Sequence, residues 1–434
     1  MNVQITANAP GFKPFWADTA PQSELHPALA GAINTDVTVI GAGFTGLRAA
    51  LMLAEAGTSV TVLDAGDVAY GASGRSGGQV NPMLPFNPPS KLRKILGEKH
   101  FERLTETSLG SADELFDLIK TYQIDCEARQ NGWLRVLHND RALRHAREGV
   151  TEWNAHGAGM QIIEGADVAK LSGSNAYRAA VITPKGGAVQ PLSLALGLAQ
   201  AGKQRGVQIF GGSAVTSLTP EGDKWIAKTA QGAVTSDWVI VATNGYTDNL
   251  IPKLAKSVIP VHPVQMATEA LPPEVIDTIL PQGHTISDSR RVIMYARREP
   301  GNRMVYGGHG KALPNGQIAG FDWLRRDAER VFPQLKGVGW SHRWGGRIAI
   351  TDDHLPHLHE PRKGLLVGLG YNGRGVAMSN VMGRVMAERV LGKAGDALPF
   401  PTSPIKAIPF QGVQVRGLGS VVWFMKLMDY LETR

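Results

Sequence analysis

The sequence predicts an α/β fold built from two domains, one discontinuous along the chain and the other of mixed α+β type. A strand, a glycine turn and a helix follow one another at residues 36–57 and again at 364–394. Residues 251–340 lie between these units and are rich in strand-forming residues and proline turns. The chain has 434 residues, more than a single hydrophobic core usually serves.

The first unit is a complete strand–helix–strand motif. Residues 36–40 (DVTVI) predict a buried strand, and the turn GAGFTG follows at 41–46. Residues 47–57 carry apolar side chains at helical spacing and end on a glycine. Residues 59–63 predict a second buried strand, which ends at Asp64. This order is typical of a Rossmann-like parallel sheet.

The glycines and the acidic residue of this motif indicate a dinucleotide site. Gly41 permits the tight turn, Gly43 lets the backbone approach a pyrophosphate, and Gly46 allows the helix to pack closely on the sheet. Backbone N–H groups and the positive end of the helix then face the phosphates. Asp64 is expected to accept hydrogen bonds from ribose hydroxyls, which disfavours NADP. The alternative is a glycine-rich turn that holds no ligand.

A second glycine-rich stretch follows at residues 71–79 (GASGRSGGQ). Four of its nine residues are glycine, so it cannot form a stable helix or strand. Its backbone amides can wrap a large flat ligand. The alternative is a flexible surface loop.

Charge and cysteine content exclude several kinds of partner and site. The formal net charge is +7, but the basic residues are scattered, so nucleic-acid binding is not expected. Cys126 is the only cysteine, which excludes an internal disulfide and fits a reducing compartment. Residues 1–16 lack the pattern of a secretory signal, and no apolar run approaches the roughly 20 residues that span a bilayer. A cytoplasmic protein is expected.

Several motifs together resemble the D-amino-acid-oxidase-like family of FAD oxidoreductases, which includes glycine, sarcosine and γ-glutamylputrescine oxidases. The resemblance covers most of the chain. It rests on residues 36–64 and 71–79, on SDWVIVATNGYTD at 236–248, on WGGRIAITDDHLPHL at 344–358, on GLGYNGRGVAMSNVMGR at 368–384, and on the arm that begins at Trp16. It implies a Rossmann-like FAD domain and a mixed-sheet substrate domain.

The resemblance also implies which residues hold FAD. The pyrophosphate and adenosine would contact Gly41, Ala42, Gly43, Thr45, Gly46, Asp64 and Ala65. The stretch Ala72, Ser73, Gly74, Arg75, Ser76, Gly77, Gly78 and Gln79 would line the pyrophosphate, ribityl chain and flavin ring. Further contacts would come from Val215, Ala242, Thr243, Gly346, Gly370, Asn372, Gly373, Arg374, Gly375 and Val376. The last of these open a helix whose N-terminus would stabilise negative charge on the reduced flavin.

The predicted division of the chain follows from these motifs and from the remaining sequence patterns. Helices are expected over 90–125 and 191–204, strands at 132–138 and within 207–218, and a hairpin and strand over 225–246. We expect an N-terminal arm (1–33), a FAD domain (34–90, 155–250 and 341–400), a substrate domain (91–154 and 251–340), and a C-terminal tail and helix (401–434).

Two departures from relatives refine the cofactor prediction. Covalent sarcosine oxidases attach FAD through a cysteine of the C-terminal motif, where this chain has Arg347 and its neighbours. Its single cysteine lies far upstream, so the FAD is predicted to be non-covalent. The chain also lacks a second GxGxxG unit, which disfavours enzymes that bind a nicotinamide cofactor as well.

The substrate is expected to be an amine that carries a carboxylate. Arginine suits this group because its planar fork offers two hydrogen bonds. The candidates for substrate binding and catalysis are Arg347, Arg374, Tyr295 and His309, with Arg297 and Tyr306 as further possibilities. The alternative for each is a solvated charge or a core tyrosine. No residue is required to act as the catalytic base.

The C-terminal third raises two further alternatives. Four histidines (His342, His354, His357 and His359) invite a metal site, but they lack acidic or cysteine partners at zinc spacing, so no metal is predicted. The apolar segment 417–432 is expected to pack on its own domain or on a second subunit. Its alternative is a helix that lies on a membrane surface.

The leading functional hypothesis is an FAD-dependent oxidase of a small primary or secondary amine, of the sarcosine, glycine, iminodiacetate or γ-glutamyl amine type. Hydride transfer to the flavin would give an imine, which hydrolyses to an aldehyde or oxo acid plus an amine, and O2 would be reduced to H2O2. One alternative is a membrane-associated amino-acid dehydrogenase that passes electrons to a quinone. Another is a non-catalytic FAD-containing binding protein.

Overall fold

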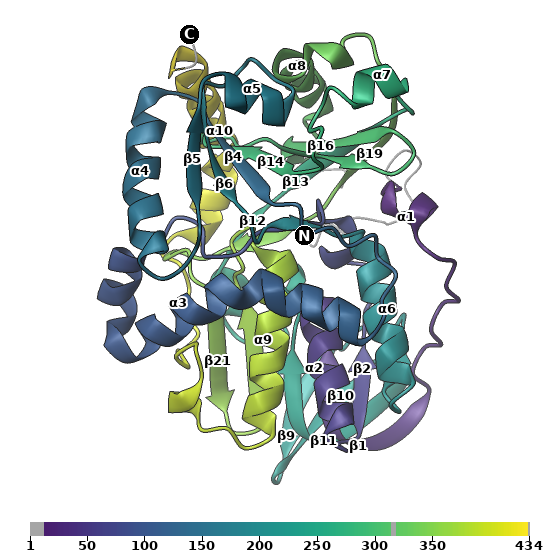
Figure 1. Ribbon diagram of the computed structural model, residues 1–434. Helices are drawn as coiled ribbons and strands as arrows, with labels where there is room; N and C mark the ends of the chain where they lie inside the picture. The colour runs from purple at the N-terminus through teal and green to yellow at the C-terminus, as the bar shows by residue number, and fades with distance from the viewer. Residues whose placement is uncertain (1–12, 314–317, 433–434) are drawn as a thin grey trace.

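Two sheets stacked end to end organise the chain, as the computed structural model shows for residues 13–313 and 318–432. In Figure 1 the first sheet fills the lower half and the second the upper half, with helix α3 (Pro89–Thr121) crossing the middle. The helix contains a break at Gly97, whose φ of 70° is outside the helical region. The helices expected over 90–125 thus form one long helix with a break near its start.

The first sheet has eight strands and carries the strand–helix–strand motif. Along its main path lie β21 (His357–Arg362), β22 (Leu365–Leu369), β11 (Gly232–Val241), β1 (Gly31–Ile40), β2 (Val60–Leu63) and β8 (Gln208–Phe210), and β10 (Lys224–Lys228) and β9 (Ser217–Glu221) extend from β11. From β22 to β8 the pairs are parallel. Helices α2 (Phe44–Glu55), α6 (Pro191–Lys203) and α9 (Gly375–Val390) cover it, and their apolar side chains form the largest core.

The second sheet is mixed and also has eight strands. Their order is β19 (Trp340–Gly345), β13 (Pro263–Thr268), β16 (Arg303–His309), β15 (Tyr295–Glu299), β14 (Thr285–Asp288), β4 (Trp133–Leu137), β6 (Ala179–Thr183) and β5 (Gln161–Glu164). One face packs Leu134, Met266 and Met304 in a core with α8 (Phe321–Val331). Because side chains alternate along a strand, the intervening residues point toward the first sheet.

The remaining elements connect and cover these sheets. The helices are α1 (Trp16–Thr19), α4 (Asp140–Asn154), α5 (Ala166–Ser172), α7 (Pro273–Ile276) and α10 (Gln411–Glu432). The short strands are β3 (Gln79–Val80), β7 (Gly187–Ala188), β12 (Ile259–Val261), β17 (Lys311–Ala312), β18 (Ile318–Ala319) and β20 (Ile348–Ile350). Single 3-10 turns occupy Ser73–Arg75, Asn244–Tyr246, Leu254–Lys256, Pro333–Leu335 and Gly395–Ala397.

Sheet membership differs from the expected division at three places. Strands β5 and β6 lie within 155–250 but pair in the second sheet, and so does β19 near the start of 341–400. Helix α3, expected with the second domain, instead packs on α9 and joins the core of the first. The reason is that a buried strand shows the same local pattern whichever sheet it enters.

The N-terminal arm is more ordered than expected. Strand β1 begins at Gly31, paired with Gly232, rather than at Asp36. Trp16 in α1 is fully buried and its ring lies edge-on to Trp344, 5.7 Å away. The first 12 residues of the arm lie outside the described part of the chain.

Helix α10 docks on the second sheet through a buried acid. Asp429 accepts hydrogen bonds from the backbone N–H groups of Arg291 and Val292, and Glu432 pairs with the Arg291 guanidinium. The opposite side of α10 exposes apolar residues, including Trp423 at 67% and Phe424 at 57%. Across residues 13–313 and 318–432, no helix is long and apolar enough to cross a membrane.

Candidate active site

The turn between β1 and α2 is built by close backbone packing. The Gly41 N–H donates to the Leu63 carbonyl at 2.8 Å, which ties the turn to β2. A Cβ on Gly46 would lie 2.0 Å from the Gly41 carbonyl oxygen, so only glycine fits there. Gly43 begins α2 without a side-chain cap. The first turn of α2 therefore keeps backbone donors for an anion.

The glycine-rich stretch 71–79 closes on this turn. The Phe44 N–H donates to Ser73 Oγ at 3.0 Å, and a Cβ on Gly43 would lie 2.9 Å from the same oxygen. A Cβ on Gly74 would lie 2.4 Å from the Ala69 carbonyl oxygen. The stretch is thus a packed part of the site rather than a free surface loop.

Asp64 directly follows β2, and its carboxylate holds the neighbouring backbone. It accepts hydrogen bonds from the N–H groups of Ala42 and Gly66, both at 2.8 Å. Desolvation raises the pKa of this carboxyl above its usual range. Two backbone donors leave lone pairs free on a carboxylate, so a ribose hydroxyl can still bind. Ala65, next along the chain, is exposed.

A second helix begins beside the first. Gly375 opens α9, and like α2 this helix has no side-chain cap. Tyr371, in the preceding turn, is hydrogen-bonded through its hydroxyl to Thr45 Oγ1 at 2.6 Å. Asn372 accepts from the Thr351 N–H at 3.0 Å and fixes the turn. The predicted residues Gly370–Val376 therefore lie next to the α2 turn, and two helix N-termini meet at one place.

The second sheet holds the other side of the glycine-rich stretch. Gln265 Nε2 and Trp344 Nε1 both donate to the Arg75 carbonyl, at 2.7 Å and 3.1 Å. Gln79 Nε2 donates to the Ala296 carbonyl at 3.0 Å, and a Cβ on Gly77 would lie 2.9 Å from the Tyr295 ring. Residues 71–79 thus lie between the two sheets.

The remaining predicted cofactor residues line the same turns. The Ala242 N–H donates to the Ile40 carbonyl at 2.8 Å, and the Ala242 carbonyl lies against Gly41. Thr243 follows it at the carboxyl end of β11. A Cβ on Gly346 would lie 3.5 Å from Arg75 Cβ. Val215 is partly buried and packs against the apolar core beside the first sheet.

These residues fit a dinucleotide that carries a flavin. Two helix N-termini, neither capped by the side chain of its own N-cap residue, could supply donors for the pyrophosphate and for the flavin pyrimidine edge. There is no room for a side chain at Gly41, Gly46 or Gly74, as expected where backbone segments approach one another and a ligand closely. Cys126, the single cysteine, is buried in the core and its pKa is raised to about 12 by desolvation.

Arg347 lies at one end of the region between the sheets. Its guanidinium carbon is 4.7 Å from the centre of the Tyr246 ring, and its Nε is buried without an acceptor. Desolvation lowers the pKa of Arg347. Among residues 13–313 and 318–432, no carboxylate forms an ion pair with it.

Tyr295 and His309 lie on the face of the second sheet that points toward the first. Tyr295 pairs with Gly307, two residues before His309 on β16. Desolvation, then the charge of Lys426, lowers the pKa of His309 to about 4. Desolvation, followed by Arg347 and His309, lowers the pKa of neighbouring His262 to about 4 as well. Both imidazoles are therefore neutral at pH 7.

Two further substrate candidates are wrong. Tyr306 points to the opposite face, where its hydroxyl donates to Asp327 Oδ2 at 2.8 Å in the core. Arg297 is buried, pairs with Glu299, and donates to the Val189 carbonyl at 2.8 Å. Local sequence alone could not show this, because the face of Tyr306 depends on strand register and the partners of Arg297 meet it only in the folded chain.

Sequence reasoning missed other side chains of this face. Trp133 and Arg135 on β4 point toward the first sheet, and Trp133 Nε1 donates to Ser287 Oγ at 2.9 Å. The available signal was the arginine at the centre of the otherwise apolar strand GWLRVLH.

The four histidines considered for a metal make other contacts, and the His354 ring lies 4.8 Å from the Phe86 ring. His342 pairs with Asp18 and His357 with Asp353, and His359 Nδ1 lies 2.8 Å from the Ser403 carbonyl. The metal-capable group found among the described residues is instead His138, Asp429 and Glu432. Arg291 already pairs with both of its carboxylates, so the group is explained by the docking of α10.

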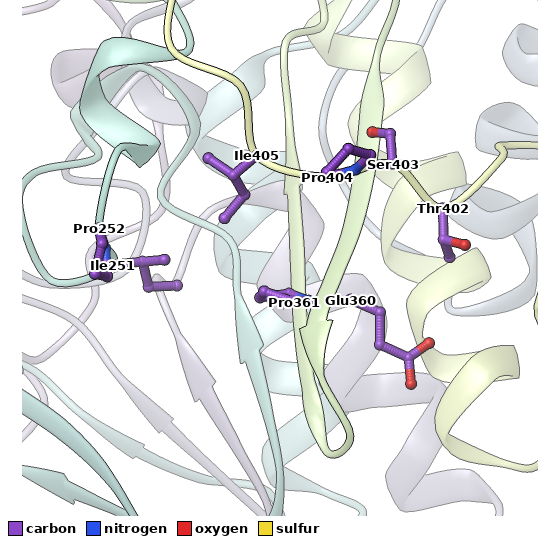
Figure 2. Close-up of a pocket in the computed structure, with 8 residues that line it drawn as sticks. All are labelled: Ile251, Pro252, Glu360, Pro361, Thr402, Ser403, Pro404 and Ile405. Atoms are coloured by element: carbon purple, nitrogen blue, oxygen red, sulfur yellow. The ribbon is translucent and has the colours of Figure 1, made fainter.

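A surface cavity of about 550 Å³ lies away from this region (Figure 2). Glu360, Thr402, Ser403 and Ile405 are among its lining residues, and none of the predicted site residues is. The Glu360 carboxylate pairs with Arg389, with both hydrogen bonds at 2.9 Å. We assign no role in the chemistry to this cavity.

Solved structures share the fold. Glycine oxidase from Geobacillus kaustophilus superposes with a TM-score of 0.72 at 20% identity, over 87% of this chain and 99% of that one. Iminodiacetate oxidase from Chelativorans sp. BNC1 gives a TM-score of 0.68 at 17% identity, over 82% and 96% of the two chains. These similarities confirm the predicted α/β fold with mixed sheets.

Sequence comparison establishes the family. The model of the FAD dependent oxidoreductase family, DAO, matches residues 36–389. Gamma-glutamylputrescine oxidoreductase of Escherichia coli (strain K12) is 33% identical over 425 residues, covering 91% of this chain and 95% of that protein. The predicted family and the predicted FAD are thereby confirmed. The chain belongs to the DAO family of FAD-dependent oxidoreductases, which act on amine or amino-acid substrates.

Proposed function

We propose that this protein is an oxidase of a small amine that carries an acidic group, with O2 as the electron acceptor and H2O2 as a product. The observation that carries the proposal is that Arg347 and Arg374, both in FAD motifs, lack a carboxylate partner among the described residues. Unpaired guanidiniums beside the expected flavin favour an anionic substrate. Related proteins named for γ-glutamylputrescine and glycine support this class.

The chain's own residues would prepare the amine for oxidation. The FAD, when bound, supplies the two-electron acceptor. An ammonium group cannot release a hydride, so the site must favour the neutral amine. Neutral His262 and His309 together with cationic Arg347 would disfavour a protonated amine. The substrate would lie between the face of the second sheet that carries Tyr295 and the turn that precedes α9, where both sheets exclude bulk water.

The test is anaerobic mixing of the FAD-loaded protein with sarcosine, glycine, iminodiacetate and γ-glutamylputrescine, while the oxidised flavin band is followed. Methylamine and putrescine serve as controls without an acid group. We expect rapid bleaching by at least one acid-bearing amine and reoxidation by O2 with release of H2O2. Equal bleaching by the controls, or none by any amine, would contradict the proposal.

A second candidate is a dehydrogenase that passes electrons to a membrane quinone. The exposed apolar side of α10, with Trp423 and Phe424, favours it. The two acceptors can be compared directly after substrate reduction. Fast reoxidation by ubiquinone in phosphatidylglycerol vesicles, with slow reoxidation by O2, would replace the oxidase by the dehydrogenase.

A further inference from the structure

Arg135 is a charged residue at the centre of the second sheet that forms no ion pair with the described residues. It pairs with Ser287 on β14, and Ser287 pairs in turn with Tyr295 on β15. The three side chains therefore share the face that points toward the first sheet. The Arg135 side chain is exposed to solvent there. Within the described residues, no hydrogen bond or ion pair involves it.

Arg374, which precedes α9 on the first sheet, lies close to the same face of β4. Its guanidinium carbon lies 4.7 Å from the centre of the Trp133 ring. Trp133 precedes Arg135 by two residues on one face of β4, a spacing of about 6.6 Å along a strand. Arg374 Nε is buried without an acceptor. Two guanidiniums, one from each sheet region, thus face one patch.

The positive charges of Arg135 and Arg374 lie close together, and no carboxylate of the described residues forms an ion pair with either of them. Desolvation, followed by the charge of Arg135, lowers the pKa of Arg374 to about 9. Desolvation also lowers the pKa of Arg135, although solvent reaches its side chain, and the charge of Asp288 offsets only part of this shift. By contrast, the buried Arg297 of the same face is neutralised by Glu299. Like charges held together without a counterion are unfavourable, so a bound anion would complete the site.

We propose that Arg135 and Arg374 together bind the carboxylate of the amine substrate. The inference rests on the proposed function and adds to it the residue that selects acid-bearing amines. Arg374 belongs to the turn that opens α9 and also faces the flavin. Arg135 comes from the second sheet and has no place in the cofactor motifs. Substitution of Arg135 is therefore expected to weaken substrate binding without weakening cofactor binding.

The test measures carboxylate binding without turnover. Glutarate is titrated into the FAD-loaded protein, and the shift of the visible flavin band gives its Kd. We expect Arg135→Gln to raise this Kd at least about tenfold, the effect of losing one charge-assisted hydrogen bond. Arg135→Lys should recover part of the affinity. Arg144→Gln, which removes an exposed arginine of α4, should leave it unchanged.

Two results would overturn the inference. One is a glutarate Kd that is unchanged in Arg135→Gln, or no glutarate binding by the unmodified protein at millimolar concentration. The other is an equal loss of FAD affinity in Arg135→Gln, which would assign the pair to the cofactor. Failure of the proposed function gives a different pattern: no amine bleaches the flavin, while glutarate binding still depends on Arg135.

Discussion

The two sheets contribute to the site in different ways. The first sheet presents backbone groups to the candidate cofactor site, at turns where Gly41, Gly46 and Gly74 leave no room for a side chain. The second sheet meets the region between the sheets with side chains, such as Arg135, Tyr295 and His309. Backbone recognition fixes which cofactor binds and tolerates little change. Side-chain recognition can vary residue by residue, so we expect the second sheet to set the substrate.

The largest effect is expected from adding a single methyl group at a glycine of the first sheet, by the substitution Gly46→Ala. Gly46→Ala would place a Cβ 2.0 Å from the Gly41 carbonyl oxygen and 2.9 Å from Val39. The turn would have to open, and we expect FAD to bind at least about 100-fold more weakly. The flavin absorbance of the purified protein and titration with FAD measure this.

Gly149→Ala is the matched control for that substitution. A Cβ at Gly149, in α4, meets nothing within 4 Å. We expect normal FAD content and a stability gain of up to about 1 kcal/mol. Full FAD content in Gly46→Ala would show that the turn is not the rigid element described here.

An effect of intermediate size is expected when the pH is lowered, because buried histidines in both sheets then become protonated and the folded protein loses stability. Desolvation lowers the pKa of His359 in the first sheet to about 4, as for His262 and His309 beside the second. The unfolded chain takes up these protons near pH 6.5, but the folded chain does so only near pH 4. Stability is therefore complete above pH 6.5 and falls as the pH drops toward 4.

Urea unfolding at neutral and acidic pH measures this loss. For buried His359 we expect about 2 kcal/mol between pH 6.5 and pH 5. His359→Gln should remove that part of the pH dependence, whereas substitution of the exposed His145 should not. An unfolding free energy that stays constant over this range would contradict a neutral, buried imidazole.

The smallest effect is expected from Tyr295→Phe in the second sheet. The ring, which contacts Gly77, is kept, and only the hydroxyl is lost. Because one neutral hydrogen bond contributes about 1 kcal/mol, an amine substrate that uses this hydroxyl should bind less than about tenfold more weakly. FAD content should not change. A loss of FAD would mean that Tyr295 supports the glycine-rich stretch rather than the substrate.

Much of the first sheet could be predicted from the sequence, and much of the second could not. The strand before Gly41, the helix after it and the strand ending at Asp64 lie where the local pattern placed them. Strands β5, β6 and β19 were recognisable as extended segments only, and their sheet was assigned differently. Strand pairing depends on segments far apart in the chain, about which periodicity carries no information.

The sequence by itself determined the cofactor and the family. The reason is that a dinucleotide is held by backbone groups of consecutive residues. The glycines that this close approach requires are therefore visible in short segments of the sequence, such as 41–46 and 71–79. Only the tertiary structure decided which side chains remain candidates for the substrate site. It rejected Tyr306 and Arg297, retained Tyr295, and brought Arg135 next to Arg374 across a separation of more than 200 residues. The face that each side chain points to is set by strand register, which forms only when the sheets assemble.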